Sequence, residues 1–191
     1  MRLPEFLQQK LRPKEGIIVQ IPNDAPIFEK PMPEGLEGEE LLKFQSRKYV
    51  YTPEDGKTVG SHQGAHYFTK GQRKGLAVGG TVEPLFVIDT DVERNVIYAG
   101  EGKLHKGLYR SVLFVQENDI HWIREDLALE PGDSMTVLAR IRYRQALEKA
   151  TVFRTGEGMY VSFDRPQSAI TEGQFVAWYQ GEELLGSGVI S

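Results

Sequence analysis

Short runs of β-branched and aromatic residues, separated by turn residues, dominate the chain from residue 85 onward. Glycine, proline and aspartate mark turns between nearly all of these runs, for example at 131–133 and 156–158. Short strands at such spacing are typical of a closed barrel or a sandwich. This part of the chain is therefore predicted to be all β, with strands over residues 85–89, 95–99, 111–115, 134–144, 150–154, 159–163, 174–179 and 184–190. Residues 118–126 are expected to form a loop or a short helical turn between two of them.

The first sixty residues carry more varied signals. Apolar residues at helical spacing predict a short helix over residues 3–11, and a β-branched run predicts a strand over 16–21. Residues 30–38 are rich in proline, glycine and glutamate, and residues 39–45 could add a helical turn or two. A further short strand is expected over 47–51.

Composition limits the functions that this chain could have. The 191 residues allow one domain or two small ones, and without cysteine there can be no disulfide, thiolate metal site or cysteine nucleophile. No apolar run approaches the length needed to cross a bilayer and no signal peptide is recognisable, so the cytoplasm is the expected location. The formal net charge of -4 argues mildly against a nucleic-acid binder, yet residues 43–76 are basic while residues 29–40 are acidic. A local basic face is therefore compatible with an acidic protein.

The most basic motif lies in a glycine-rich stretch from residue 60 to residue 80. Glycines flank its cations, which predicts a tight loop that presents polar side chains and lets a ligand approach the backbone. Cationic side chains beside exposed amides suit an anion such as phosphate, although a charged hairpin turn without a ligand is an equally good interpretation. The candidate anion-binding residues are Lys70, Gly71, Gln72, Arg73, Lys74 and Gly75.

A second basic motif lies in the strand expected over residues 134–144. Strict alternation would place Arg140, Arg142 and Arg144 on one face, in a row about 7 Å apart. Phosphates of a single strand have a similar spacing, so the row could follow an RNA backbone. The alternative is a solvated strand face whose arginines pair with carboxylates such as Glu148.

Other candidate sites are weaker. His62 and His66 are four residues apart, but no third ligand is evident for a metal, so packing or RNA contact is the preferred role. Lys48 is a further possible RNA contact, and Trp122 and Trp178 are expected in the core. No catalytic nucleophile, carboxylate pair or Walker-type phosphate loop is recognisable.

The order of residues in the glycine-rich stretch is more specific than its charge. The stretch reads Gly60-x-His62-x-Gly64-x-His66-x-x-Thr69-x-Gly71-Gln72-Arg73-Lys74-Gly75-Leu76. Further motifs follow at Pro84-Leu85-Phe86-Val87, Asn95-Val96-Ile97, Arg140-Ile141-Arg142-Tyr143-Arg144, Phe163-Asp164-Arg165-Pro166 and Leu185-Gly186-Ser187-Gly188. Together they resemble the signature of the tRNA-uridine 2-sulfurtransferases, the 2-thiouridylases long labelled tRNA methyltransferases.

The resemblance implies a mainly β chain with a small β-rich central domain over residues 1–80, followed by a six-stranded closed barrel over 81–191, like that of translation elongation factors. It implies a parent enzyme that adenylates the wobble uridine of tRNA with ATP and then transfers sulfur from a persulfide cysteine. The expected partners are tRNA and a sulfur-carrier protein, without DNA or membrane. The basic loop and the three arginines would then contact tRNA.

The chain also departs from that pattern. It has neither the Ser-Gly-Gly-x-Asp-Ser loop that binds ATP in the family nor either cysteine, so the chain by itself is expected to be inactive and to need no cofactor. Some two dozen additional residues lie between about 28 and 52. The competing interpretation is a module that docks the catalytic domain or a sulfur-carrier protein.

Overall fold

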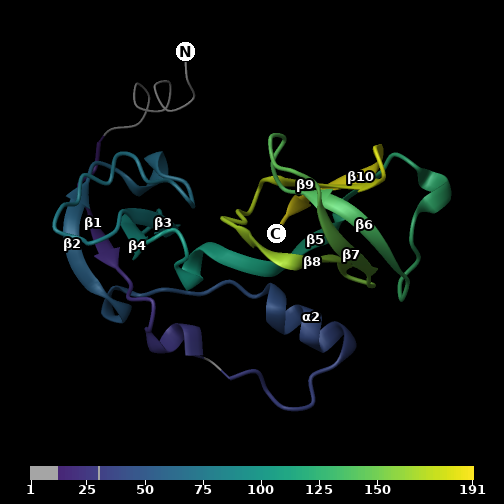
Figure 1. Cartoon of the computed structure of the whole chain (residues 1–191), viewed down its shortest axis with the longest axis horizontal. Helices are drawn as coiled ribbons and strands as arrows, with labels where there is room; N and C mark the ends of the chain where they lie inside the picture. The colour runs from purple at the N-terminus through teal and green to yellow at the C-terminus, as the bar shows by residue number, and fades with distance from the viewer. Residues whose placement is uncertain (1–12, 30) are drawn as a thin grey trace. The chain divides into compact units, whose positions relative to one another are not determined.

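The computed structural model describes residues 13–29 and 31–191, so the helix expected over residues 3–11 lies outside the described part. The chain divides into two compact units (Figure 1). The sheet unit comprises Met1–Pro31 with Tyr49–Leu108, and the barrel unit comprises Met32–Lys48 with Tyr109–Ser191. None of the helices found in the described residues is both long and apolar enough to cross a membrane.

The sheet unit contains a four-stranded sheet in the order β2-β1-β4-β3. Its outer strands pair antiparallel with their neighbours, while the two central strands run parallel to each other. The strands expected over residues 85–89 and 95–99 are confirmed as β3 and β4, which pair with each other. Because β4 also pairs with β1, this unit continues to Leu108, beyond the boundary expected near residue 80. The strands are β1 (Gly16–Gln20), β2 (Lys57–His62), β3 (Leu85–Asp91) and β4 (Val96–Glu101).

Apolar side chains from all four strands and from the glycine-rich stretch form the core of this unit. Ile18, Val87 and Ile97 are fully buried, and Ala65 and Leu76 pack against them. Single 3-10 turns connect the strands, namely η1 (Pro26–Glu29), η2 (Pro53–Asp55), η3 (Ala65–Tyr67) and η4 (Lys106–Leu108).

The barrel unit is a closed six-stranded antiparallel barrel in the order β10-β5-β8-β7-β6-β9, which confirms the predicted fold class. Every strand contributes buried apolar residues to the barrel core, in which Trp178 is fully buried. The strands are β5 (Tyr109–Trp122), β6 (Ser134–Arg140), β7 (Glu148–Arg154), β8 (Gly158–Ser168), β9 (Phe175–Gln180) and β10 (Glu183–Ile190), and η5 (Glu125–Leu127) follows β5.

Three strands of the barrel end four or more residues from the predicted position. Strand β8, expected to end at residue 163, continues to Ser168 because its last residues pair with the start of β5. Strand β5 continues through Trp122, where a loop was expected, because that residue pairs with Gly186 and its indole packs 5.3 Å from the Trp178 ring. Strand β6 ends at Arg140, four residues early. The expected core positions of both tryptophans are confirmed.

The additional segment near residues 28–52 is divided between the two units. The predicted helical turns are confirmed as α2 (Gly38–Ser46), which lies against β5 and β8 of the barrel. Arg110 Nη1 donates a hydrogen bond to the carbonyl oxygen of Ser46 at 2.9 Å, and Lys48 Nζ lies 2.5 Å from the Glu172 carboxylate. Residues 47–51 do not form the expected strand; instead, Tyr49 and Tyr51 pack against the Phe28 ring in the sheet unit.

Candidate nucleic-acid interface

The basic loop, residues 69–76, is tied to strand β3 by its backbone. The amide of Gly71 donates to the Val87 carbonyl at 2.7 Å, and the amide of Val87 donates to the Gln72 carbonyl at 2.9 Å. Gly71 and Gly75 have positive φ angles of 81° and 93°, a region that favours glycine. The structure thus contains a tight loop at this position, with a conformation that depends on its two glycines.

Two of the candidate binding side chains hold the loop in shape. The Gln72 side chain accepts from the Thr69 amide at 3.2 Å and donates to the Lys74 carbonyl at 2.8 Å, so both ends of its amide group are used within the loop. Lys70 Nζ lies 3.2 Å from the Asp89 carboxylate on β3, and its side chain is only 18% exposed. These contacts assign Lys70 and Gln72 to the support of the loop.

The other two candidates are presented to solvent. Arg73 and Lys74 are both exposed, and the side chain of neither makes a hydrogen bond or an ion pair within residues 13–29 and 31–191. Arg73 also borders a shallow groove of about 310 Å³ that is lined by residues 76–85. A Cβ at Gly79 or Gly80, two of the lining residues, would meet no atom within 4 Å. The loop therefore offers two adjacent free cations on a braced support.

The three arginines after strand β6 do not form the predicted row. Because the strand ends at Arg140, the next two arginines lie in the β6–β7 turn rather than on a strand face. Arg142 Nη2 donates to the Ser168 and Ala169 carbonyls at 3.2 and 2.9 Å, whereas Arg144 is exposed. The interpretation of a regular strand face that follows a phosphate backbone is thus wrong, and the three side chains have different roles.

Arg140 contacts two tyrosines. Its Nη2 donates to the Tyr179 hydroxyl at 2.8 Å and its Nη1 donates to the Tyr143 carbonyl at 3.0 Å. Its Cζ lies 5.4 Å from the Tyr143 ring centroid and 5.1 Å from that of Tyr179. The sequence analysis assigned no role to Tyr143, whose only signal is an aromatic residue between two arginines.

The remaining candidates are scattered. His62 is 5% exposed with its Nδ1 accepting from the Gly64 amide at 2.9 Å, so it belongs to the core of the sheet unit. The half-buried His66 ring lies 4.0 Å from the Tyr67 ring, and Lys48 is in the barrel unit, paired with Glu172. In the part of the chain that the structure describes, no group of three potential ligands could hold a metal ion.

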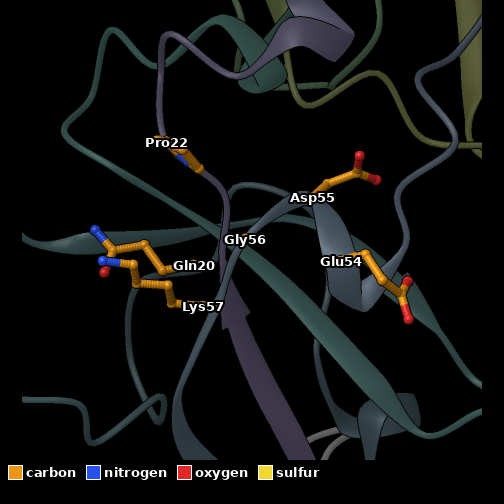
Figure 2. Close-up of a pocket in the computed structure, with 6 residues that line it drawn as sticks. All are labelled: Gln20, Pro22, Glu54, Asp55, Gly56 and Lys57. Carbon is orange, nitrogen blue, oxygen red and sulfur yellow. The ribbon is translucent and has the colours of Figure 1, made fainter.

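A second hollow, of about 430 Å³, lies beside β1 and β2 in the sheet unit. Figure 2 shows Gln20 and Lys57 together on one side, and Glu54 and Asp55 pointing away from them. Asp55 already accepts hydrogen bonds from the Thr52 amide and hydroxyl at 2.7 and 3.0 Å, as the cap of η2. Since its polar groups do not converge on one point, this hollow is a weaker candidate than the basic loop.

The stability of the sheet unit is expected to fall as the pH drops below about 6.5. Burial lowers the pKa of His62 and of His105 from the ordinary value. His105 is 1% exposed, its Nδ1 faces the Gly107 amide at 3.1 Å, and its Nε2 lies 3.0 Å from the Ile21 carbonyl, an arrangement that suits only the neutral ring. Between the ordinary pKa and the lowered one, the unfolded chain binds more protons than the folded chain, so acidification favours unfolding.

Urea unfolding at about pH 7.5 and about pH 5.5 measures this effect, because carboxylates are still mostly ionised at the lower value. His121 is exposed, so His121→Gln provides a matched control that should keep the full pH dependence. An unfolding free energy that is equal at the two pH values would contradict the expectation.

The fold and the loop define the class to which the chain belongs. Residues 39–101 match the family described as the tRNA methyl transferase PRC-barrel domain, and residues 114–190 match the aminomethyltransferase beta-barrel domain. The chain thus contains a PRC-barrel domain and a C-terminal β-barrel domain of these two families. More particularly, it belongs to the family of the tRNA-specific 2-thiouridylases, of which it carries the PRC-barrel and C-terminal barrel domains.

Two curated relatives match over the whole chain and a third matches over part of it. The tRNA-specific 2-thiouridylase MnmA of Flavobacterium johnsoniae is 62% identical over 191 residues, which are 100% of this chain and 48% of that protein. The protein of the same name from Christiangramia forsetii is 59% identical, with the same coverage. That of Shouchella clausii is 45% identical over 137 residues, which are 71% of this chain and 36% of that protein. The chain spans about half the length of the first two relatives.

Proposed function

We propose that this chain is the tRNA-contacting part of a tRNA-specific 2-thiouridylase that makes 2-thiouridine at the wobble position of the anticodon. The name of its curated relatives supports the substrate class, and the basic loop supplies groups that suit a phosphate backbone. In the proposed parent, ATP activates the uridine and a persulfide cysteine supplies the sulfur. These 191 residues contain no cysteine, so the sulfur-transfer step could not take its thiol from them.

The observation that carries this proposal is the pair of free cations at Arg73 and Lys74. When exposed lysine and arginine side chains bind a ligand, ordering them costs conformational entropy, and this cost weakens the binding. Here their backbone is held to β3 on one side and by the Gln72 amide group on the other. A braced pair of cations without competing carboxylates is a suitable partner for two adjacent phosphates.

Replacing Arg73 or Lys74 by alanine is expected to weaken the binding of a wobble-uridine tRNA and to lower the salt slope of log K by about 1 for each contact removed. Both side chains are exposed and unpaired, so the fold should be unaffected. Fluorescence anisotropy across a salt series measures both quantities. Lys57→Ala, an exposed lysine on β2 of the same unit, is the matched control. Slopes that stay at the wild-type value in both loop variants would contradict the proposal.

The competing proposal is a docking module for the catalytic domain or for a sulfur-carrier protein. It is favoured by two apolar side chains of the sheet unit, Val82 and Leu104, which are 99% and 84% exposed. Exposed apolar side chains of this size are typical of protein interaction sites only when they gather in a patch. Co-purification with a sulfur carrier, abolished by Val82→Ser while tRNA affinity stays unchanged, would support docking.

A further inference from the structure

The most exposed aromatic ring in the described residues belongs to Tyr143, in the β6–β7 turn. Its residue is 86% exposed, whereas Tyr160 of the same unit is 3% exposed. A large ring held in water contributes nothing to the barrel core, so packing does not explain a tyrosine at this position. Phe175 on β9, at 64%, is the other strongly exposed aromatic residue of the barrel unit among the described residues.

Although Tyr143 is exposed, Arg140 fixes its position. Arg140 Nη1 donates to the Tyr143 carbonyl oxygen at 3.0 Å, and the guanidinium group contacts the Tyr143 ring. The same group donates to the Tyr179 hydroxyl on the neighbouring strand β9. The turn itself is closed by a hydrogen bond from the Gln145 amide to the Arg142 carbonyl at 3.1 Å. A ring that is ordered before binding loses little conformational entropy when a ligand covers it.

The chemistry around the ring is cationic. Residues 140–147 contain three arginines and no acidic residue. Arg142 is committed to the carbonyls of Ser168 and Ala169, which leaves Arg144 as the exposed cation next to the ring. A free aromatic face beside a free cation is the combination by which proteins bind single-stranded nucleic acid, the ring stacking on a base and the cation contacting a phosphate.

From this arrangement we propose that Tyr143 is a stacking platform for one unpaired base of the bound RNA. Arg144 contacts the adjacent phosphate, and Arg140 is a positioning residue that acts through Tyr143. The inference rests on the proposed function, since it adds a base contact in the barrel unit to the phosphate contacts of the basic loop. A stacking platform at Tyr143 should bind RNA with unpaired loops more tightly than duplex RNA, because bases within a duplex have no free face.

The test uses the whole 191-residue chain and two RNA probes. One is an anticodon stem-loop with 2-aminopurine in the loop, and the other is a blunt duplex of equal charge. Tyr143→Leu is expected to lower the affinity for the stem-loop about 5- to 100-fold, to abolish quenching of 2-aminopurine, and to leave both duplex affinity and salt slope unchanged. Tyr143→Phe keeps the ring and should keep the affinity. Phe175→Leu, which removes the other exposed ring, is the matched control.

Arg140→Lys tests the positioning role. The charge is retained but the fork that joins Tyr143 to Tyr179 is lost. Quenching should therefore weaken while the salt slope stays at its wild-type value. A purely electrostatic role for Arg140 would instead leave quenching intact in this variant, which would overturn its assignment.

The outcomes separate this inference from the function on which it rests. If Tyr143→Leu binds both RNAs like the wild type while Arg73→Ala weakens binding, the stacking platform is overturned and the proposed function stands. Equal losses for stem-loop and duplex would also overturn stacking, and a loss confined to capture of a sulfur-carrier protein would assign the turn to protein docking. Absence of any RNA binding by the wild-type chain at low salt would overturn both proposals.

Discussion

Replacing Asn95 by alanine is expected to lower the free energy of unfolding by about 3–5 kcal/mol, a loss comparable to that from truncating a buried core side chain. Asn95 is 5% exposed, and its amide group makes three hydrogen bonds. Its Oδ1 accepts from the Ala65 amide at 2.9 Å, while Nδ2 donates at 2.9 Å to the carbonyls of Lys14 and Glu15. Alanine would leave the buried Ala65 amide without this partner and would also remove the two part-buried bonds to Lys14 and Glu15.

The backbone of Asn95 adds a second cost for alanine. Its φ angle is 58°, in the left-handed region that asparagine tolerates better than alanine does. Asn95→Gly removes the hydrogen bonds without this strain, so it should be about 1 kcal/mol more stable than Asn95→Ala. Asn95→Asp keeps the acceptor for Ala65 but directs a carboxylate oxygen at two carbonyls. Urea unfolding that ranks Asn95→Ala level with the wild type would contradict the assigned bracing role.

Replacing Gly186 by alanine is expected to destabilise the barrel by about 3 kcal/mol or more, at the upper end of the overpacking range. A Cβ at this position would lie 2.6 Å from the His121 carbonyl oxygen and 2.7 Å from the Trp178 ring. Neither neighbour can move freely, since the first is backbone of β5 and Trp178 is fully buried. Thermal unfolding followed by tryptophan fluorescence measures the loss.

Gly156→Ala is the matched control for Gly186→Ala. A Cβ at Gly156 would meet nothing within 4 Å, and the residue is in the same unit, between β7 and β8. Its substitution should change the unfolding free energy by no more than about 1 kcal/mol, and alanine can even stabilise by restricting the unfolded chain. Similar losses for the two variants would mean that steric contact at Gly186 is not the cause.

Much of the fold could be predicted because its signals are local. Alternating β-branched runs marked the strands of the barrel, and the glycines at 71 and 75 marked a tight loop because positive φ angles favour that residue. The same local reasoning failed for Arg142 and Arg144. Alternation of arginines with apolar residues is equally compatible with a strand and with the turn that follows Arg140. The strand ends at Arg140 because its pairing with β9 ends there, which the local pattern does not show.

The candidate site was only partly predictable, since charge is visible in a sequence but its use is not. Lys70 and Arg73 are both cations of one motif, yet only Lys70 is neutralised, by Asp89 on a strand nineteen positions later. Tyr143 could not be distinguished from a core aromatic, because inward and outward positions depend on where the strand ends.

The sequence by itself determined the β class of this protein, the positions of most of its turns and the conformation of its basic loop, since each depends on the stereochemistry of neighbouring residues. Only the tertiary structure decided which cations remain free, which tyrosine is exposed and that α2 packs on the barrel through Arg110 and Lys48. These features depend on partners far apart in the chain, which are brought together by strand pairing in the sheet and by closure of the barrel rather than by any local pattern.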